Sequence, residues 1–165
     1  MTDTSKNRIY PVLVALLLLV IAAMGYKFIV VGSTENTEDG RVAIILEPGE
    51  RALMLREMRD FVVGLQQISD ALSRDDMRDV AKAARTMGAA RAHGVPIAMM
   101  SKLPLDFKTA ALAVHSEFDT IAMDAESFGL PKRTLEQLSD VLQKCSACHA
   151  AHRVTVATSQ VATIQ

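Results

Sequence analysis

The chain has 165 residues, and its 18 Lys and Arg residues almost balance 19 Asp and Glu residues. Because both signs are interspersed, no basic stripe is present to neutralise a phosphate backbone, which argues against nucleic acid as a partner. About 125 residues remain after an apolar N-terminal segment, which suits one compact core and excludes a multidomain machine. The absence of Trp and the wealth of Ala, Leu and Met predict an all-α fold.

The first element along the chain is an uncharged run from Ile9 to Tyr26. Its length matches the roughly 20 residues that a helix needs to cross a bilayer. Two cations precede the run and acidic residues follow it, which predicts a cytoplasmic N-terminus. We therefore expect residues 1–32 to be a single-pass anchor in the inner (cytoplasmic) membrane, with the C-terminal domain in the periplasm. The alternative is a signal peptide, since small residues within the run would suit cleavage.

Residues 33–48 are predicted to be a linker. The segment is polar and acidic as far as Gly40, and a brief β-prone run then leads to Pro48. At the other end of the chain, residues 154–165 are predicted to be a tail. Because 154–158 is also β-prone, we expect it to pair with the run that begins at Arg41, as a two-stranded ribbon.

Four amphipathic helices are predicted between these segments, each with apolar residues at alternating steps of three and four. We expect the first at 49–72, the second from a capping sequence at 73–76 to Gly94, the third at 105–127 and the fourth from Pro131. Short connections make an antiparallel up-down four-helix bundle the simplest arrangement. Thr134 and Gln137 form a capping-box candidate in the fourth helix, whose inward stripe is predicted to contain Leu138, Leu142, Cys145, His149 and His152.

The sequence CSACH at residues 145–149 is the pattern of covalent haem attachment. Thiols three residues apart on a helix add across the two haem vinyl groups, and the following histidine reaches the iron. Cys145 and Cys148 are the chain's only cysteines. A redox dithiol is the first alternative, although such a pair is expected at a helix N-terminus. Zinc is the second, although no fourth ligand is evident beside His149 and His152.

The segment CSACHAAHR at the end of a fourth helix resembles the class II c-type cytochromes, which comprise cytochrome c′ and its methionine-ligated low-spin relatives. The resemblance covers about residues 50–153 and extends to ERALMLREMRDF, which is similar to the family's first helix. It implies a four-helix-bundle haem domain at 49–153 with one haem c. This chain has His152 where the family commonly has tyrosine, followed by the usual Arg153.

Candidate haem contacts follow from the helical pattern. His149 is the expected proximal iron ligand, and Met58 is the preferred distal ligand because it faces inward near the height of His149. Met54, one turn away, is the reserve, and both methionines have the alternative of filling the core. The expected haem environment includes four further side chains, namely Arg153, His152, His115 and Phe107.

A buried haem held between histidine and methionine favours electron transfer over substrate turnover. We therefore expect a periplasmic-facing electron carrier whose partners are membrane-associated redox proteins, with no small-molecule substrate. No paired carboxylates or activated nucleophile indicate an enzyme. One alternative is a five-coordinate haem protein that binds NO or CO, as in cytochrome c′. Another is a haem-bearing structural subunit of a respiratory complex.

Overall fold

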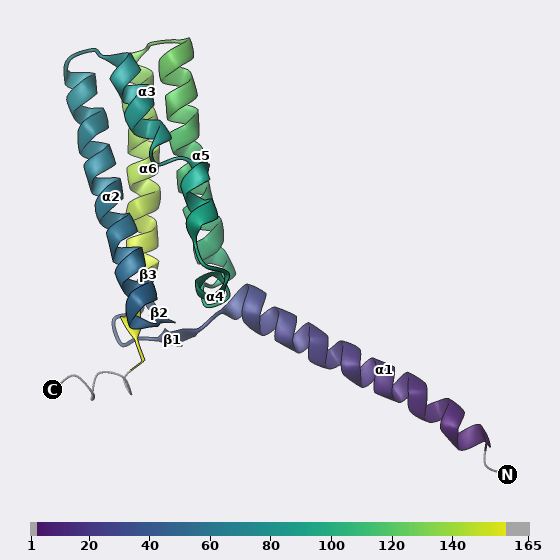
Figure 1. Cartoon of the computed structure of the whole chain (residues 1–165). Coiled ribbons are helices and arrows are strands. Elements are labelled where there is room, and N and C mark those ends of the chain that lie inside the picture. The colour runs from purple at the N-terminus through teal and green to yellow at the C-terminus, as the bar shows by residue number, and fades with distance from the viewer. Residues whose placement is uncertain (1–2, 158–165) are drawn as a thin grey trace.

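The structure is a computed structural model that describes residues 3–157. It is mostly helical, with one small sheet (Figure 1). The elements follow in the order α1 (Asp3–Gly25), the π-helix η1 (Tyr26–Val31), β1 (Thr34–Asn36), β2 (Val42–Leu46), α2 (Pro48–Ser73), α3 (Met77–Arg85), the 3-10 helix η2 (Ala89–Gly94), α4 (Ile97–Met100), α5 (Leu105–Ser127), α6 (Pro131–Ala151) and β3 (His152–Val156).

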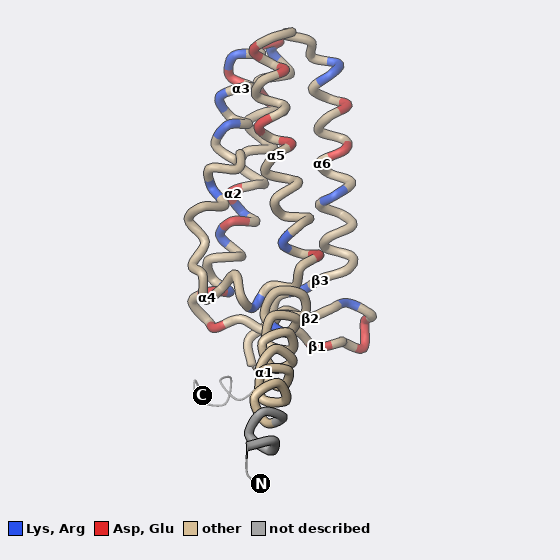
Figure 2. Tube along the Cα trace, turned by 90° about the vertical axis from the view of Figure 1, so that its right-hand side faces the viewer, with Lys and Arg blue, Asp and Glu red and all other residues tan. Residues whose placement is uncertain are grey.

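The N-terminal apolar segment forms one continuous helical rod that projects away from the other helices (Figure 1). Residues Ile9–Val31 are long and apolar enough to cross a membrane, and this span is not buried against the rest of the chain. Charged residues are instead distributed along the remaining helices, while α1 is uncharged from Ile9 to Gly25 (Figure 2). The predicted single N-terminal apolar helix is therefore present.

Helices α2, α3, α5 and α6 lie side by side in the remainder of the chain (Figures 1 and 2). α3 packs against both α2 and α5, and α5 also packs against α6. The bounds predicted for the first helix differ from those of α2 by one residue at each end. The third helix was predicted with the bounds that α5 has. Both predictions succeeded because long stretches of alternating three- and four-residue spacing were available.

Two apolar cores share this group of helices. The first lies where α3 fills the space between α2 and α5, around Phe118, Ile68 and Val80. The second lies nearer the sheet and contains Ile44, Met99 and other large side chains from β2, α2, α4 and α5. The first core is built largely on small alanines of α3, which allow close helix approach.

The prediction that the second helix continues to Gly94 was wrong, because α3 ends at Arg85. Gly88 is extended, and a side chain there would overlap Asp119 of α5. The Asp119 carboxylate accepts a hydrogen bond of 2.8 Å from the Ala89 backbone N–H, which holds the start of η2 in place. A non-local contact thus overrides the helical pattern and produces a wider connector that includes α4.

The sheet has the order β1-β2-β3. β2 pairs with β3 in parallel, with Val42 opposite His152, so the predicted pairing of the two β-prone segments is confirmed as far as Val156. Thr158, the last residue of the predicted ribbon, lies outside the described residues. The prediction of a plain linker at 33–48 was wrong, since β1 adds an antiparallel strand to β2.

The polar residues of this segment build the turn between β1 and β2. The Thr37 hydroxyl donates to the Arg41 carbonyl at 2.6 Å, and the Arg41 guanidinium donates to Asp39. Hydrogen bonds from the Arg41 guanidinium and from the Thr37 hydroxyl to Asp39 hold the pKa of its carboxyl well below its usual range. Gly40 supplies the positive φ of 80° that the turn requires. The polar composition of this segment therefore indicates a tight turn between two strands and not a flexible linker.

The inward stripe of α6 differs from the predicted one. Val141 is fully buried, whereas Leu142 is 49% exposed and points outward. The buried face runs from Thr134 through Leu138 and Val141 to the two cysteines, at alternating steps of four and three. His149 therefore lies at the edge of this face. The Thr134 and Gln137 capping box is absent, because the N-cap of α6 is Leu130 and Thr134 lies inside the helix. Gln137 instead donates to Asp124.

Candidate functional site

A cavity of about 390 Å³ lies between α2, α5, α6 and the connector that contains η2 and α4. This volume falls within the range of pockets that hold small molecules and cofactors. Its wall is mostly apolar. Seven of the predicted site residues line it, namely Cys145, Cys148, His149, Met54, Met58, His115 and Phe107. Residues separated by up to 95 positions in the sequence are thus brought to one cavity.

The two thiols approach the cavity from one face of α6, in its last two turns. Both are free and about half enclosed by neighbouring groups. Burial raises the pKa of the Cys145 thiol and of the Cys148 thiol above the ordinary value. At neutral pH both are therefore mostly protonated, unlike the low-pKa thiolate on which a redox dithiol depends. Geometry and acidity both argue against the redox-dithiol alternative.

His149 follows the second thiol and lies at the rim of the cavity on the exposed edge of α6. Its position is a consequence of helical geometry, since a residue next to Cys148 is rotated by about 100° around the helix axis. The imidazole thus reaches the cavity from a side different from that of the thiols. The structure places all three side chains of the attachment motif on one cavity.

The two methionines of α2 both line the cavity from the opposite wall. Met54 is 8% exposed and belongs to the second core, while Met58 is half-buried. They lie one helical turn apart on the same face of α2. Thioether sulfur is therefore available across the cavity from α6, as the sequence predicted.

His115, one of the expected haem contacts, is a buried histidine of α5. Its Nδ1 atom lies 2.7 Å from the Met87 carbonyl, and its ring packs 5.1 Å from the Phe61 ring. The carbonyl fixes Nδ1 as the protonated nitrogen, which leaves Nε2 as an acceptor. His115 thus lines the cavity while also being held in the first core.

Two predicted contacts lie outside the cavity. His152 Nε2 lies 3.3 Å from an Asp106 carboxylate oxygen, and its ring packs edge-on against Phe107 at 5.5 Å. Arg153 lies on β3, with a guanidinium nitrogen 3.8 Å from the Asp39 carboxylate. The start of β3 at His152 turns both residues away from the axis of α6. Neither is therefore among the residues that line the cavity.

Charged residues at the cavity wall were missed by the sequence analysis. Arg91 of η2 donates to the Glu57 carboxylate at 2.7 Å and to Asp60 at 2.5 Å, and these bonds raise the pKa of the guanidinium. Lys144 Nζ lies 2.5 Å from the Glu117 carboxylate. No periodicity signals these pairs, because they join helices distant in the sequence. From the sequence alone, only the opposite charges of these residues could be recognised.

Among residues 3–157, no group of three or more His, Cys, Asp or Glu side chains is arranged to hold a metal ion. The zinc alternative therefore finds no support in the described part of the chain. Comparisons with protein-family models, curated protein sequences and solved structures gave no match to this chain. Its function is thus argued from the cavity and the motif.

Proposed function

We propose that this protein is a membrane-anchored c-type cytochrome that carries electrons through one covalently bound haem c. One observation carries the proposal: both thiols of the C-x-x-C-H motif, its histidine and two methionines line the same apolar cavity. The proposal makes the protein an electron carrier without an enzymatic activity of its own. Its partners would be redox proteins associated with the same membrane.

The residues that line the cavity fit the group that the motif implies. The Sγ atoms of Cys145 and Cys148 would add across its two vinyl groups and hold it as thioethers. The His149 imidazole would ligate the iron at the cavity rim, and a methionine sulfur would approach from α2. When bound, the haem supplies a one-electron change at iron. The apolar wall excludes water and so favours a raised reduction potential.

Burial supports Met58 over Met54 as the distal ligand, because Met54 is enclosed in the second core whereas Met58 is half-buried at the cavity. Lys144 meets Glu117 near the middle of α6, and His152 meets Asp106 at its end, so the level of His149 falls between these two pairs. On the other side, Phe61 of α2 packs against His115 at 5.1 Å. Met58 and Met54 lie about one and two turns before Phe61, so the level of His149 falls between them and each lies within about one turn of it.

The finer assignment of the fold belongs to the same proposal. We infer that α2, α3, α5 and α6 form an antiparallel up-down four-helix bundle of the class II cytochrome kind. The packing of α3 between α2 and α5, and of α6 against α5, supports this inference. The attachment motif at the end of the last helix supports it as well.

The apolar N-terminal helix supports a single-pass location in the inner membrane. We propose that its N-terminus is cytoplasmic and that the domain lies in the periplasm, where c-type haem is attached. The balance of charges on either side of the run favours that direction. The end of α1 is joined closely to the domain, so the carrier would be held at the membrane surface.

The test is an optical spectrum of the reduced full-length protein in detergent, matured in a host that attaches haem c, with and without CO. Met58→Ala is compared with Met54→Ala, since the two methionines line the same cavity one turn apart. We expect a low-spin wild type whose spectrum does not change when CO is added. Met58→Ala should bind CO and become high-spin, while Met54→Ala should keep the wild-type spectrum.

Other outcomes are equally informative. A high-spin wild type that binds CO would favour the NO- or CO-binding function instead, because the distal position would then be open. A CO response in Met54→Ala alone would exchange the roles of the two methionines. A protein without covalent haem after maturation would overturn the proposal, and Cys145→Ser with Cys148→Ser provides the reference for that state.

A further inference from the structure

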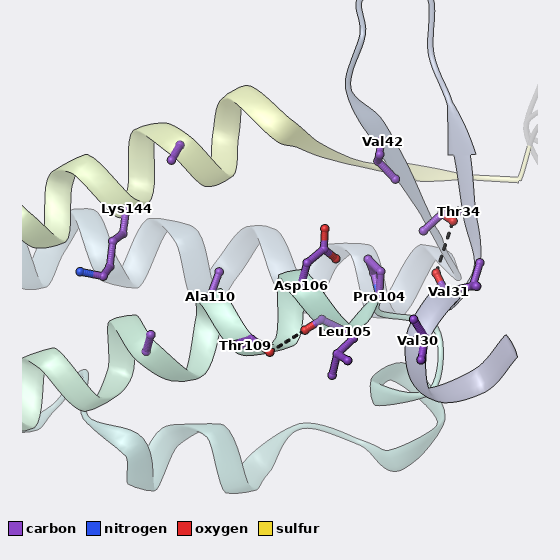
Figure 3. Close-up of a pocket in the computed structure, with 12 residues that line it drawn as sticks. Val30, Val31, Thr34, Val42, Pro104, Leu105, Asp106, Thr109, Ala110 and Lys144 are labelled. Atoms are coloured by element: carbon purple, nitrogen blue, oxygen red, sulfur yellow. Dashed lines mark hydrogen bonds between the residues drawn. The ribbon is translucent and has the colours of Figure 1, made fainter. Parts of the chain in front are cut away.

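A second hollow, of about 880 Å³, lies beside the end of the apolar N-terminal helix (Figure 3). Its wall begins at Val30 and Val31, the last residues of the segment that is able to span a membrane. It continues over β2 and along small residues of α5 and α6, including Ala113 and Ala147. This groove therefore opens at the level where the chain leaves the apolar span.

The wall that the anchor contributes is fixed to the domain. Gly32 adopts a φ of 68° against the backbone of Lys102 and Leu103, where a side chain would overlap main-chain atoms. The Ser33 N–H donates to the Lys102 carbonyl at 2.8 Å, and Lys108 Nζ donates to the Ile29 carbonyl at 2.9 Å. These contacts hold the end of the anchor against α5, so the groove is a permanent feature.

The groove also borders the proposed haem cavity. Ala110 of α5 and Lys144 of α6 line both hollows. An occupant of the groove would thus be separated from the cavity by a single layer of side chains. Lys144 itself is engaged with Glu117 at 2.5 Å and is not available to bind an anion in the groove.

One acidic group faces the groove. The Asp106 side chain is 72% exposed, and in Figure 3 its carboxylate points away from α5 toward the space beside α6. One of its oxygens lies 3.3 Å from His152 Nε2. The His152 side chain is only 9% exposed, and its Nδ1 is buried without a hydrogen-bond partner among the described residues. Together they form a carboxylate and imidazole pair able to accept a hydrogen bond and a proton.

We propose that this groove binds a membrane hydroquinone, with a ring hydroxyl donating to Asp106 and the isoprenoid tail passing Val30 and Val31 into the bilayer. The inference rests on the proposed function. Oxidation of one hydroquinone to the quinone releases two electrons and two protons. Two copies of the chain would each accept one of these electrons through the haem that Cys145, Cys148 and His149 would hold. The protons leave to water by way of the Asp106 and His152 pair.

The chemistry of the wall selects this occupant over others from the bilayer. A phospholipid would bring its phosphate toward Asp106, and like charges repel. A hydroquinone is neutral and donates hydrogen bonds, which suits a carboxylate with apolar surroundings. A water-soluble partner would not need a groove that begins on the membrane-spanning segment. The groove thus assigns the membrane quinone pool as the electron donor.

The first measurement is stopped-flow reduction of the full-length holoprotein in lipid nanodiscs by decyl-ubiquinol. Ala113→Phe fills the groove, and Asp106→Asn removes the charged acceptor. Both should slow haem reduction by roughly tenfold or more, because the ring is displaced or its proton has no acceptor. Ala52→Phe, an exposed position on α2 outside both hollows, is the matched control and should keep the wild-type rate. Dithionite should reduce all four proteins equally.

The second measurement reports binding without electron transfer. The chain contains no Trp, so Thr109→Trp places a single fluorophore at the groove, and Leu135→Trp places one elsewhere on α6. Decyl-ubiquinone should quench the first saturably and leave the second unaffected. Equal rates for Ala113→Phe and wild type, with no selective quenching, would overturn the inference while dithionite reduction leaves the proposed function intact.

A failure of the proposed function has a different signature. Without covalent haem no reduction is observed, yet selective quenching at Thr109→Trp would still establish the quinone site. If the wild type is instead dimeric, Ala113→Phe is monomeric and quenching is absent, then the groove is an interface between copies of the chain. That result would also overturn the inference.

Discussion

The two ends of the helical domain are built from the same spacing of apolar residues, yet one is filled and the other is hollow. At the end away from the sheet, α3 fills the space beside α2 and α5, and side chains such as Phe118 and Ile121 are fully buried. At the end near the sheet, α3 is replaced by η2 and α4, and a cavity remains. Because α3 does not reach the end near the sheet, that end contains a cavity, whereas the other end has a packed core.

The difference also appears in residue type. The packed end relies on alanines of α3, whose small side chains allow close contact between backbones. The hollow end has methionines, cysteines and histidines facing a space that the connector does not fill. Methionine tolerates an irregular or changeable boundary because its chain is flexible and polarisable. The packed end is thus expected to contribute most of the stability, while the hollow end contains the candidate site.

The sharpest test of this division is to truncate one large side chain at each end. Phe118→Ala should lower the free energy of unfolding by about 3–5 kcal/mol, because the ring is fully buried and leaves a void. Met58→Ala should cost the haem-free protein only about 1 kcal/mol, because Met58 is half-buried beside an existing cavity. Urea unfolding of the full chain in detergent, followed by helical circular dichroism, measures both. Equal losses of unfolding free energy in the two variants would show that the two ends of the domain do not differ in packing.

A smaller effect is expected where Gly64 of α2 packs against Met87, which follows the end of α3. A methyl group at Gly64 would overlap the buried side chain of Met87, so Gly64→Ala should destabilise the protein by about 1–3 kcal/mol. Gly49→Ala, in the same helix, meets nothing within 4 Å and is the control. The same unfolding assay applies, and stabilisation by Gly64→Ala would show that the contact is loose.

The boundary between the two ends depends on one carboxylate. Asp119→Ala removes the acceptor of the Ala89 N–H and should cost about 1 kcal/mol. Asp119→Asn keeps an acceptor oxygen and should retain most of the stability. Hydrogen exchange of the amides in η2 reports the effect locally. If exchange in Asp119→Ala is no faster than in wild type, the carboxylate does not set the point where α3 gives way to the connector.

The smallest effect concerns the surface of the packed end. Arg85 donates to the Glu126 carboxylate at 3.1 Å, and this hydrogen bond lowers the pKa of Glu126. Its contribution is present above the pKa of an unfolded glutamate and is lost as the pH falls through the lower folded value. Arg85→Gln should therefore lower Tm slightly at pH 7 and leave it unchanged at pH 2. An exposed pair contributes little, so a large shift would contradict this account.

The sequence predicted best what depends on long regular spacing. α2 and α5 matched their expected bounds closely because six apolar positions at alternating steps of three and four supported each. The second helix failed because nothing near Gly88 signals the Asp119 side chain, which is 31 residues away. The linker prediction failed because β1 is a short strand that exists only through its pairing with β2. Non-local contacts were decisive in both cases.

The residues of the candidate site were likewise predicted correctly only where a local sequence pattern marked them. Cys145, Cys148 and Met58 were found because a motif or a helical face marked them, and the structure brings them to one cavity. The stripe of α6 was predicted one residue out of phase at Leu142, since Val141 and Leu142 are equally apolar. His152 was assigned to the inward stripe as if the helix continued, but the backbone becomes β3 there. Arg153 was expected just past the helix end, and it lies on β3 near Asp39.

The parallel pairing of β2 with β3 has a consequence for biogenesis. Val42 pairs with His152, a residue 110 positions later, so β3 joins the sheet only after the chain has been made as far as this strand. Until then α6 has no fixed end, and its two thiols remain in an open segment. Any machinery that modifies Cys145 and Cys148 therefore has a defined interval in which to act, which ends when the last strand is added beside the anchor.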